Sequence, residues 1–251
     1  MIDENAIYNA DCFDVMQYIK DKSIDLILCD LPYRTTACKW DTILPLKELW
    51  KEYERIITDK GAIVLFCAQP FTTTLINSNI ELFKYCWVWE KTRPFDIMNS
   101  KNKPLKAHED IAVFSKGTVA NKSERRMNYY PQGLIKVDKK WSRPKKYDTE
   151  HGTKRDSHKL ERVLEFENYP RTVLKFANPN NNKHHPTEKP ISILEYLIKT
   201  YTEEGMSVLD NCMGSGSTCV AAKQTNRTYI GIEKEERYFK IASNRINEML
   251  L

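Results

Sequence analysis

The sequence lacks several features that mark particular classes of protein. No apolar run approaches the roughly 18 residues that a membrane span needs, and residues 1–5 lack the basic and apolar segments of a secretory signal. None of the seven cysteines belongs to a CxxC pair, and His184 and His185 have no third metal ligand at a useful spacing. We therefore expect a cytoplasmic protein with reduced thiols, no metal site and no membrane segment.

Positive charge is modest overall but concentrated in one segment. The 251 residues carry a formal net charge of +5, whereas residues 115–160 contain 13 basic and 5 acidic side chains, a local net charge of +8. The remainder of the chain therefore carries a net charge of −3. Such a block usually neutralises the phosphates of a nucleic acid, although a solvated, lysine-rich loop has the same composition.

The basic segment also interrupts a regular pattern. From residue 116 to 169 there is little apolar periodicity, so we divide the chain into one domain, residues 1–114 and 170–251, and a basic insertion, residues 115–169. Outside the insertion, apolar runs predict strands over 6–9, 24–28, 62–67, 85–89, 110–114, 172–176, 206–210 and 228–233. Apolar residues at helical spacing predict helices over 13–19, 45–57, 70–78, 191–201, 218–224 and 235–249. This alternation predicts an α/β fold with a doubly wound, mostly parallel sheet covered by helices on both faces.

A first candidate site, Asp30-Leu31-Pro32-Tyr33, follows the predicted strand 24–28. Ligands bind at the carboxyl ends of the strands in open α/β sheets. A residue before proline is restricted to an extended conformation, so the carbonyl of Leu31 is held in a fixed direction. One carboxylate, one aimed carbonyl and one flat ring suit a planar group that carries an amine. Taken singly, Asp30 could instead cap a turn and Tyr33 could belong to the core.

A second candidate site runs from Asp210 to Thr218 and contains Gly214-Ser215-Gly216 between a predicted strand and a predicted helix. The glycines let the backbone pass close to a ligand, and the helix N-terminus favours anionic groups. Glu233 ends the next strand, where an acid can accept both hydroxyls of a ribose. Because Cys219 replaces the third glycine of the dinucleotide fingerprint, a nicotinamide dehydrogenase is the poorer interpretation. A nucleoside without a pyrophosphate, such as S-adenosylmethionine, fits better.

Together these stretches resemble the motifs of the amino-group DNA methyltransferases, which modify adenine N6 or cytosine N4. Residues 30–33 resemble the family's D-P-P-Y motif, residues 210–218 its D-P-F-x-G-S-G-T-T cofactor loop, and residues 185–190 its H-P-T-Q-K-P segment. Residues 103–109 also match a pattern of bacterial and phage members. The order of the motifs, with the catalytic motif first and the cofactor loop last, is similar to the β arrangement, in which the insertion recognises the target.

The resemblance implies a Rossmann-like methyltransferase fold that binds S-adenosylmethionine and double-stranded DNA, and it suggests a homodimer. It assigns catalysis to Asp30, Leu31, Pro32 and Tyr33. It implies that Asp11 faces the cofactor's adenine, that Thr187 and Lys189 lie near its methionine carboxylate and that Glu233 binds its ribose. The full candidate cofactor set is Asp11, Asp30, Thr187, Lys189, Asp210, Cys212, Gly214, Ser215, Gly216, Ser217, Thr218 and Glu233. The candidate DNA contacts are Arg125, Arg126, Lys139, Lys140, Arg143, Lys145 and Lys146.

The expected chemistry is the transfer of a methyl group to an exocyclic amine. We expect Asp30 and the Leu31 carbonyl to accept the two N–H bonds of that amine, and Tyr33 to stack on its base. Orientation should carry most of the acceleration, and the base must first be flipped out of the duplex. The polar segment 34–42, which contains Trp40, is predicted to be a loop.

Four positions depart from the family motifs: Leu31 and Asn211 replace prolines, Cys212 replaces phenylalanine and Glu188 replaces glutamine. Leu31 keeps the required carbonyl, whereas the smaller Cys212 predicts weaker cofactor binding. Aspartate at position 30 favours adenine N6, because cytosine-N4 enzymes more often begin this motif with serine. Cytosine-N4 methylation, methylation of RNA or protein, and a non-catalytic nucleic-acid-binding protein remain as alternatives.

Overall fold

The computed structural model describes residues 2–32, 44–142, 161–178 and 188–248. The chain divides into a larger unit, Met1–Tyr130 with Thr172–Leu251, and a smaller unit, Pro131–Arg171. Among the described residues, no helix has both the length and the apolar character that crossing a membrane requires.

The larger unit alternates strands and helices along most of its length, as the sequence predicts. Its strands are β1 (Ala6–Asn9), β2 (Ile24–Asp30), β3 (Ile57–Cys67), β4 (Phe83–Phe95), β5 (Lys106–Phe114), β8 (Val173–Phe176), β9 (Ser207–Asp210) and β10 (Thr228–Glu233). Its helices are α1 (Cys12–Met16), α2 (Leu46–Ile56), α3 (Phe71–Ser78), α4 (Ile191–Tyr201), α5 (Ser217–Gln224) and α6 (Glu236–Glu248), with a short 3-10 turn η1 (Ile97–Asn99).

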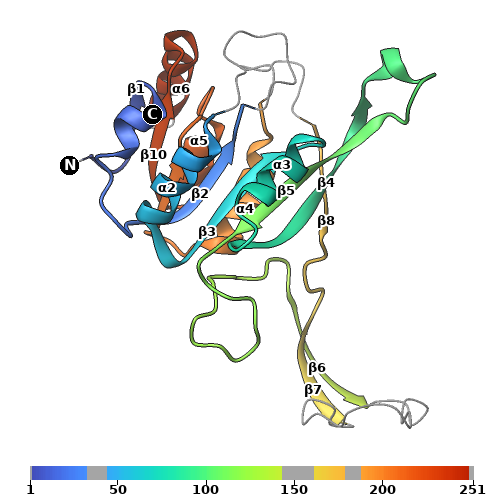
Figure 1. Cartoon of the computed structure of the whole chain (residues 1–251). Helices are drawn as coiled ribbons and strands as arrows, with labels where there is room; N and C mark the ends of the chain where they lie inside the picture. Colours follow the sequence, from blue (N-terminus) through green and yellow to red (C-terminus); the bar gives the residue numbers. More distant parts are fainter. Residues whose placement is uncertain (1, 33–43, 143–160, 179–187, 249–251) are drawn as a thin grey trace. The chain divides into compact units, whose positions relative to one another are not determined.

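These strands form one eight-stranded sheet in the order β1-β10-β9-β2-β3-β5-β4-β8. Only β5 runs antiparallel to its two neighbours, and every other neighbouring pair is parallel. The fold is therefore the predicted α/β fold with a mostly parallel sheet (Figure 1). The carboxyl ends of β2, β9, β10 and β1 meet at one edge, which brings the two candidate sites together although they are far apart in sequence.

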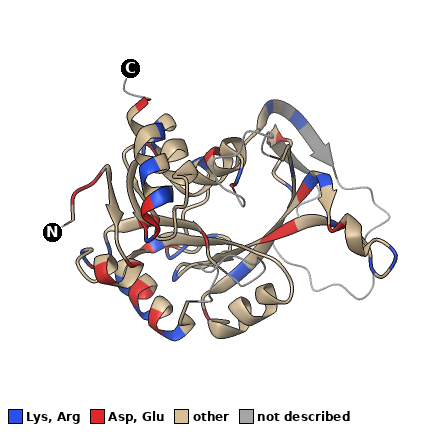
Figure 2. Ribbon diagram, turned by 90° about the horizontal axis from the view of Figure 1, so that it is seen from above, with Lys and Arg blue, Asp and Glu red and all other residues tan. Residues whose placement is uncertain are grey.

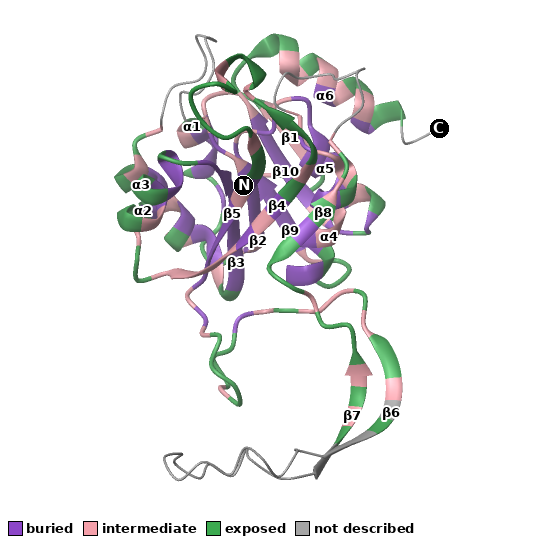
Figure 3. Cartoon of the chain, turned by 90° about the vertical axis from the view of Figure 1, so that its right-hand side faces the viewer, coloured by how far each residue is buried: buried purple, intermediate pink, exposed green. Residues whose placement is uncertain are grey.

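Alternating side chains of the strands fill two separate cores, one on each face of the sheet. In β2, Leu26 and Leu28 pack with the apolar residues of α4, α5 and α6. Ile27 and Cys29 point to the other face and pack with α1, α2 and α3. Figure 2 shows helices on both sides of the sheet, and Figure 3 shows the central strands buried between them.

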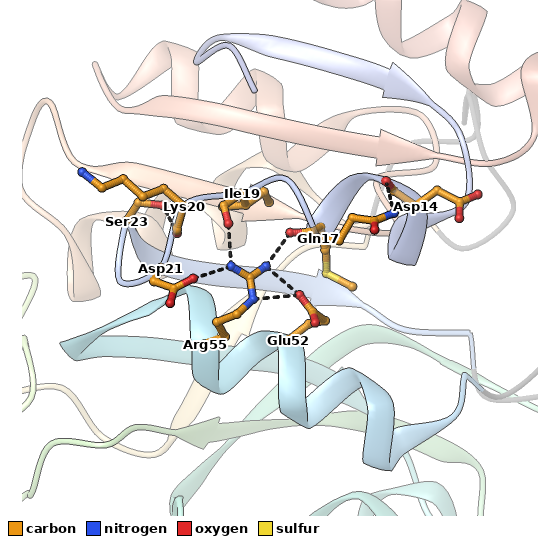
Figure 4. Close-up of polar contacts among 9 residues, drawn as sticks. Asp14, Gln17, Ile19, Lys20, Asp21, Ser23, Glu52 and Arg55 are labelled. Atoms are coloured by element: carbon orange, nitrogen blue, oxygen red, sulfur yellow. Dashed lines mark hydrogen bonds and ion pairs between the residues drawn. The ribbon is translucent and has the colours of Figure 1, made fainter. Parts of the chain in front are cut away.

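Arg55 of α2 fixes the turn that leads into β2 (Figure 4). Its Nη1 donates to the carbonyl of Ile19 and to Asp21 Oδ1, each at 2.6 Å. Its Nη2 donates to the carbonyl of Met16 at 2.7 Å and to Glu52 Oε2 at 2.6 Å. Because the carbonyls belong to the end of α1 and the turn after it, this one guanidinium ties the segment before β2 to α2.

The smaller unit contains two strands that the sequence pattern did not predict, β6 (Ile135–Ser142) and β7 (Glu161–Glu167), which pair antiparallel. The described side chains of this hairpin are exposed or half-buried and none is buried (Figure 3). Periodicity reveals a strand only where one of its faces is buried. A hairpin held by its backbone ladder therefore gives a weak signal.

Residues 115–130, which the sequence analysis grouped with the insertion, belong to the larger unit. Ser115 is buried and its Oγ donates to the carbonyl of Gly61 at 2.7 Å. Met127 is part of the core on the α4–α6 face. The N–H of Tyr130 donates to the carbonyl of Thr200 at 2.7 Å. The basic segment is therefore divided between the two units.

Candidate active site

Asp30 is the last residue of β2 and pairs in register with Phe66 of β3. Its side chain is 20% exposed, and its Oδ2 accepts a hydrogen bond from Lys189 Nζ. Among the described residues, the other oxygen, Oδ1, is buried without a hydrogen-bond partner. An unpaired buried oxygen is costly, so Oδ1 is suited to a donor that a ligand brings.

Lys189 joins Asp30 to a second carboxylate. Its ammonium lies 3.6 Å from Glu109 Oε2 and 5.1 Å from the centroid of the Phe66 ring. Glu109 Oε1 in turn accepts a hydrogen bond from Lys91 Nζ at 2.5 Å. The four charged side chains form a row of alternating sign, Asp30–Lys189–Glu109–Lys91, which we call the charged row. Each charge has an opposite neighbour, so the row restrains the position of the Asp30 carboxylate.

Burial and neighbouring charges set the protonation of the charged row. Burial raises the pKa of Asp30 to about 6, although Lys189 lowers it and Glu109 raises it further. Burial alone would raise the pKa of Glu109, but Lys189 and Lys91 hold it below its ordinary value. Burial lowers the pKa of Lys91, against the opposing effect of Glu109. Asp30 is therefore the carboxylate of the row whose charge changes nearest to neutral pH.

The loop between β9 and α5 lies at the same edge of the sheet and is tied to Glu233, the last residue of β10. Glu233 Oε2 accepts the N–H of Gly214 and its Oε1 accepts the N–H of Glu235, each at 2.8 Å. Each carboxylate oxygen keeps a lone pair for a further donor. Gly216 has a φ of 78°, and a Cβ at this position would lie 2.8 Å from the Cβ of Ala242. Glycine is thus needed for the loop to pack against α6.

The start of this loop is anchored by two buried side chains. Asp210, at the end of β9, accepts the N–H of Cys212 at 3.1 Å, and burial raises its pKa to about 6. The Oδ1 of Asn211 accepts a hydrogen bond from the hydroxyl of Tyr53 in α2 at 2.5 Å. Asn211, at a position where the resemblance leads one to expect proline, therefore gives the loop a polar tie to α2.

Glu188 and Arg245 anchor the end of the loop. Glu188 Oε1 lies 3.0 Å from Arg245 Nη2 and accepts a hydrogen bond from Ser217 Oγ at 3.1 Å. Arg245 Nη1 also donates to the carbonyl of Ser215 at 2.7 Å. Glutamate at position 188 therefore forms an ion pair that glutamine could not form, which accounts physically for this departure from the family motif.

The sequence pattern of the DNA methylase family matches residues 24–244, most of the chain. This chain belongs to that family. It is 24% identical over 271 residues to Type II methyltransferase M1.MboII of Moraxella bovis, with 99% of each chain covered. It also resembles the solved structure of M1.HpyAVI in complex with SAM (TM-score 0.63, 24% identity, 96% of this chain and 98% of that chain). A further similar structure is the cytosine-N4-specific PvuII DNA methyltransferase (TM-score 0.66, 15% identity, 98% of this chain and 87% of that chain).

In this DNA methyltransferase, Asp11 caps a helix. It follows β1 and is the N-cap of α1, where its Oδ1 accepts the N–H of Phe13 at 3.1 Å. Its Oδ2 lies 3.1 Å from the exposed ammonium of Lys234, next to Glu233. The resemblance places Lys189 near the cofactor's carboxylate, and the structure gives its ammonium two carboxylate partners within the protein itself.

The candidate DNA contacts of the methyltransferase are divided between its two units. Arg125 and Arg126 are exposed on the larger unit. Lys139 lies on β6 in the smaller unit and pairs with Glu167 at 2.9 Å, with its side chain 65% exposed. Lys140 lies on the same strand. Several predicted positions lie outside the described residues: Tyr33, Thr187, Arg143, Lys145, Lys146 and the 34–42 loop with Trp40. Leu31 and Thr218 are described and both are buried.

Three largely buried charged residues of the site were given no role by the sequence analysis: Lys91, Glu109 and Arg245. Glu109 ends the 103–109 stretch that matches the family. The sequence therefore places it within a recognised motif but does not identify the residues that it contacts. Lys91 and Arg245 lie on a strand and a helix where charged side chains are usually exposed. Their signal is burial, since the side chains are 8% and 13% exposed, and burial of a charge is visible only in the folded chain.

Proposed function

We propose that this DNA methyltransferase transfers a methyl group from S-adenosylmethionine to the exocyclic N6 amine of a flipped-out adenine in double-stranded DNA. One observation carries the proposal. Asp30 Oδ1 is a buried acceptor without a partner among the described residues, at the sheet edge that also holds Glu233 and the glycine loop. An amine N–H donates to such an oxygen, and a base supplies that amine only when it has left the duplex.

The residues at the carboxyl edge fit S-adenosylmethionine. Glu233 has free lone pairs on both oxygens for the ribose hydroxyls, and Gly216 lets the loop run where a side chain would collide with α6. We assign Asp11 to the adenine ring of the cofactor, and Thr187 and Lys189 to its carboxylate, from the family resemblance. When bound, the cofactor supplies a methyl group on a sulfonium, which needs no further activation.

The chain's own residues have to orient a poor nucleophile, because the lone pair of an exocyclic amine is conjugated with the ring. Asp30 Oδ1 accepts one N–H of that amine, and the Leu31 carbonyl, held by Pro32, accepts the other. Both bonds favour the tetrahedral nitrogen with its lone pair turned away from the protein acceptors. Lys189 donates a hydrogen bond to Asp30 Oδ2, and this bond keeps Oδ1 directed toward the amine. Asp30 Oδ1 then holds the proton that the amine loses.

Adenine is favoured over cytosine by the aspartate at the first position of the motif, since the family's cytosine-N4 enzymes more often have serine there. An exocyclic amine of cytosine would meet the same two acceptors. The overall fold does not separate the two, because the cytosine-N4-specific PvuII enzyme is similar over 98% of this chain.

The identity of the methylated base is the decisive measurement. The protein is incubated with unmethylated plasmid DNA and labelled S-adenosylmethionine, the DNA is digested to nucleosides, and the labelled nucleoside is identified by mass spectrometry. N6-methyladenosine as its deoxynucleoside supports the proposal. N4-methyldeoxycytidine would replace adenine by cytosine as the target, and label in RNA alone would overturn both.

Asp30→Ala tests the role of the carboxylate. We expect methyl transfer to fall by at least about a thousandfold, on the order of losing a principal transition-state contact, while the dissociation constant for S-adenosylmethionine changes much less. Single-turnover transfer and isothermal titration measure the two quantities. Near-normal transfer by this variant would contradict the mechanism.

We further propose that the enzyme is a homodimer, which the family resemblance suggests, and that it acts in the cytoplasm, where free thiols such as those of its cysteines stay reduced. Sedimentation velocity over a range of protein concentrations measures the mass directly, and a monomer at every concentration would contradict the dimer.

A further inference from the structure

The hairpin formed by β4 and β5 extends beyond the rest of the sheet. The last residue of β3, Cys67, pairs with Asp110, whereas β4 continues to Phe95, which pairs with Lys106. β4 is antiparallel to β5 and β5 is antiparallel to β3, so β4 points in the same direction as β3. The hairpin therefore leaves the sheet at the edge that carries Asp30 (Figure 1). Residues 93–106, which we call the hairpin tip, lie beyond that edge.

The hairpin tip presents two large apolar side chains to solvent. Ile97 is 73% exposed and Met98 is 92% exposed, an arrangement that water disfavours unless the residues meet a partner. The turn that carries them is held by its own contacts. Asp96 has a φ of 74°, and its carboxylate accepts a hydrogen bond from Asn99 Nδ2 and pairs with Lys103 Nζ, each at 2.5 Å. Contacts among its own residues therefore hold the turn that exposes Ile97 and Met98.

The charge of the hairpin tip indicates the partner. Arg93, Lys101, Lys103 and Lys106 are its basic residues, and Asp96 is its only acidic one. Figure 2 shows both basic and acidic positions along the projecting hairpin, so the excess of positive charge belongs to residues 93–106. A basic surface around an apolar tip is complementary to a nucleic acid, whose phosphates surround stacked apolar bases. A second protein chain would need acidic groups around an apolar pocket to match this surface.

The base of the same hairpin belongs to the charged row. Lys91 on β4 pairs with Glu109 on β5, and Glu109 lies 3.6 Å from the Lys189 ammonium that holds Asp30. From Lys91 to Ile97 the chain spans at most about 20 Å, at roughly 3.3 Å per residue. Asp30 lies three strands away from β4 in the sheet, a further separation of about 14 Å at roughly 4.8 Å per strand. The apolar tip and the reacting carboxylate thus lie at the same edge of the sheet, where a single bound duplex can meet both.

We propose that Ile97 and Met98 insert into the DNA beside the target base and stabilise its flipped state, while Arg93 and Lys101 contact the flanking phosphates. Flipping a base removes its stacking and pairing, and apolar side chains between base steps offset that loss. This inference rests on the proposed flipping of the target and adds the residues that favour it.

The test compares two synthetic duplexes that contain the sequence found methylated in plasmid DNA. In one the target base is paired. In the other it lies opposite an abasic site, so that flipping it out of the stack costs less free energy. For the Ile97→Ala/Met98→Ala variant we expect kcat/KM on the paired duplex to fall about tenfold or more, in line with a lost unstacking contribution. On the abasic duplex it should stay within about twofold of the wild-type enzyme.

Ile80→Ala is the matched control, because Ile80 is 59% exposed just before β4, at the opposite end of the hairpin. It should behave like the wild type on both duplexes. If the Ile97→Ala/Met98→Ala variant loses the same amount of kcat/KM on both duplexes, or none on either, the inference is overturned. Equal losses that accompany a change of oligomeric state overturn it as well. The methylated base identified on the plasmid tests the adenine proposal separately: methylated cytosine would refute adenine, while the same pair of duplexes still tests the hairpin tip.

Discussion

We expect the protonation of Asp30 to set the pH range in which the enzyme works. Burial raises the pKa of Asp30 to about 6, and only the ionised carboxylate accepts hydrogen bonds at both oxygens without donating one. We therefore expect kcat/KM to fall about tenfold per pH unit as the pH drops below about 6, and to level off above it. Methyl transfer measured across this range gives the profile. An acid limb near the ordinary carboxyl range, about 4, would contradict the assignment.

Replacing either of the two charged neighbours of Asp30 should shift the acid limb of the pH profile of kcat/KM, and the two replacements should shift it in opposite directions. Glu109 raises the pKa of Asp30 and Lys189 lowers it. Glu109→Gln therefore moves the limb to lower pH and Lys189→Met moves it to higher pH. The same pH profile measures both variants. Glu90→Gln is the control, because Glu90 is an exposed carboxylate on β4 that pairs with Lys175; shifts of equal sign in the two test variants would disprove the charged row as a positioning device.

Helix α2 supports the cofactor loop at the scale of whole elements. The hydroxyl of Tyr53 donates to Asn211 Oδ1, and both residues are buried. Tyr53→Phe leaves a buried amide oxygen unpaired, so we expect the free energy of unfolding to fall by about 1–3 kcal/mol, together with weaker S-adenosylmethionine binding. Urea denaturation and isothermal titration measure the two effects.

Tyr18→Phe is the control for this prediction, because Tyr18 is 65% exposed. It should change neither the free energy of unfolding nor the affinity for the cofactor. If Tyr53→Phe lowers stability but leaves cofactor affinity unchanged, the hydrogen bond stabilises the core without setting the loop.

At the scale of the whole molecule, the two units should separate catalysis from target choice. The smaller unit, Pro131–Arg171, carries 11 basic and 7 acidic residues. Replacing it by a flexible glycine–serine linker should leave the fold and the cofactor affinity of the larger unit intact. We expect DNA affinity to fall at least about tenfold, with a weaker dependence on salt.

Circular dichroism and cofactor titration establish that the shortened chain has folded, and fluorescence anisotropy with labelled duplex DNA at several salt concentrations measures its binding. Unchanged DNA affinity and salt dependence would show that the smaller unit has no part in binding, and would leave two separate basic groups on the larger unit, the hairpin tip and the pair Arg125 and Arg126.

Much of the larger unit could be predicted because its signals are local. The continuous apolar run Ala62–Cys67 indicates a strand buried on both faces, and such runs alternating with helical periodicity define a layered α/β fold. The β6–β7 hairpin could not be predicted in this way, because its described side chains have no buried face to set a period. Sequence and structure divide residues 115–130 differently for a related reason: their composition is basic, while Ser115 and Met127 are fixed by contacts with distant parts of the chain.

The sequence by itself determined the class of fold, the order of the motifs and the aspartate that ends β2, since each depends on neighbouring residues. Only the tertiary structure decided which charges meet. Lys189 and Asp30 are 159 residues apart, and Glu109 comes to Lys189 from another strand, β5. A pattern along the chain reports the environment of each residue but not its partner. The partner follows from the order of strands in the sheet, which brings β2, β4 and β5 to one edge.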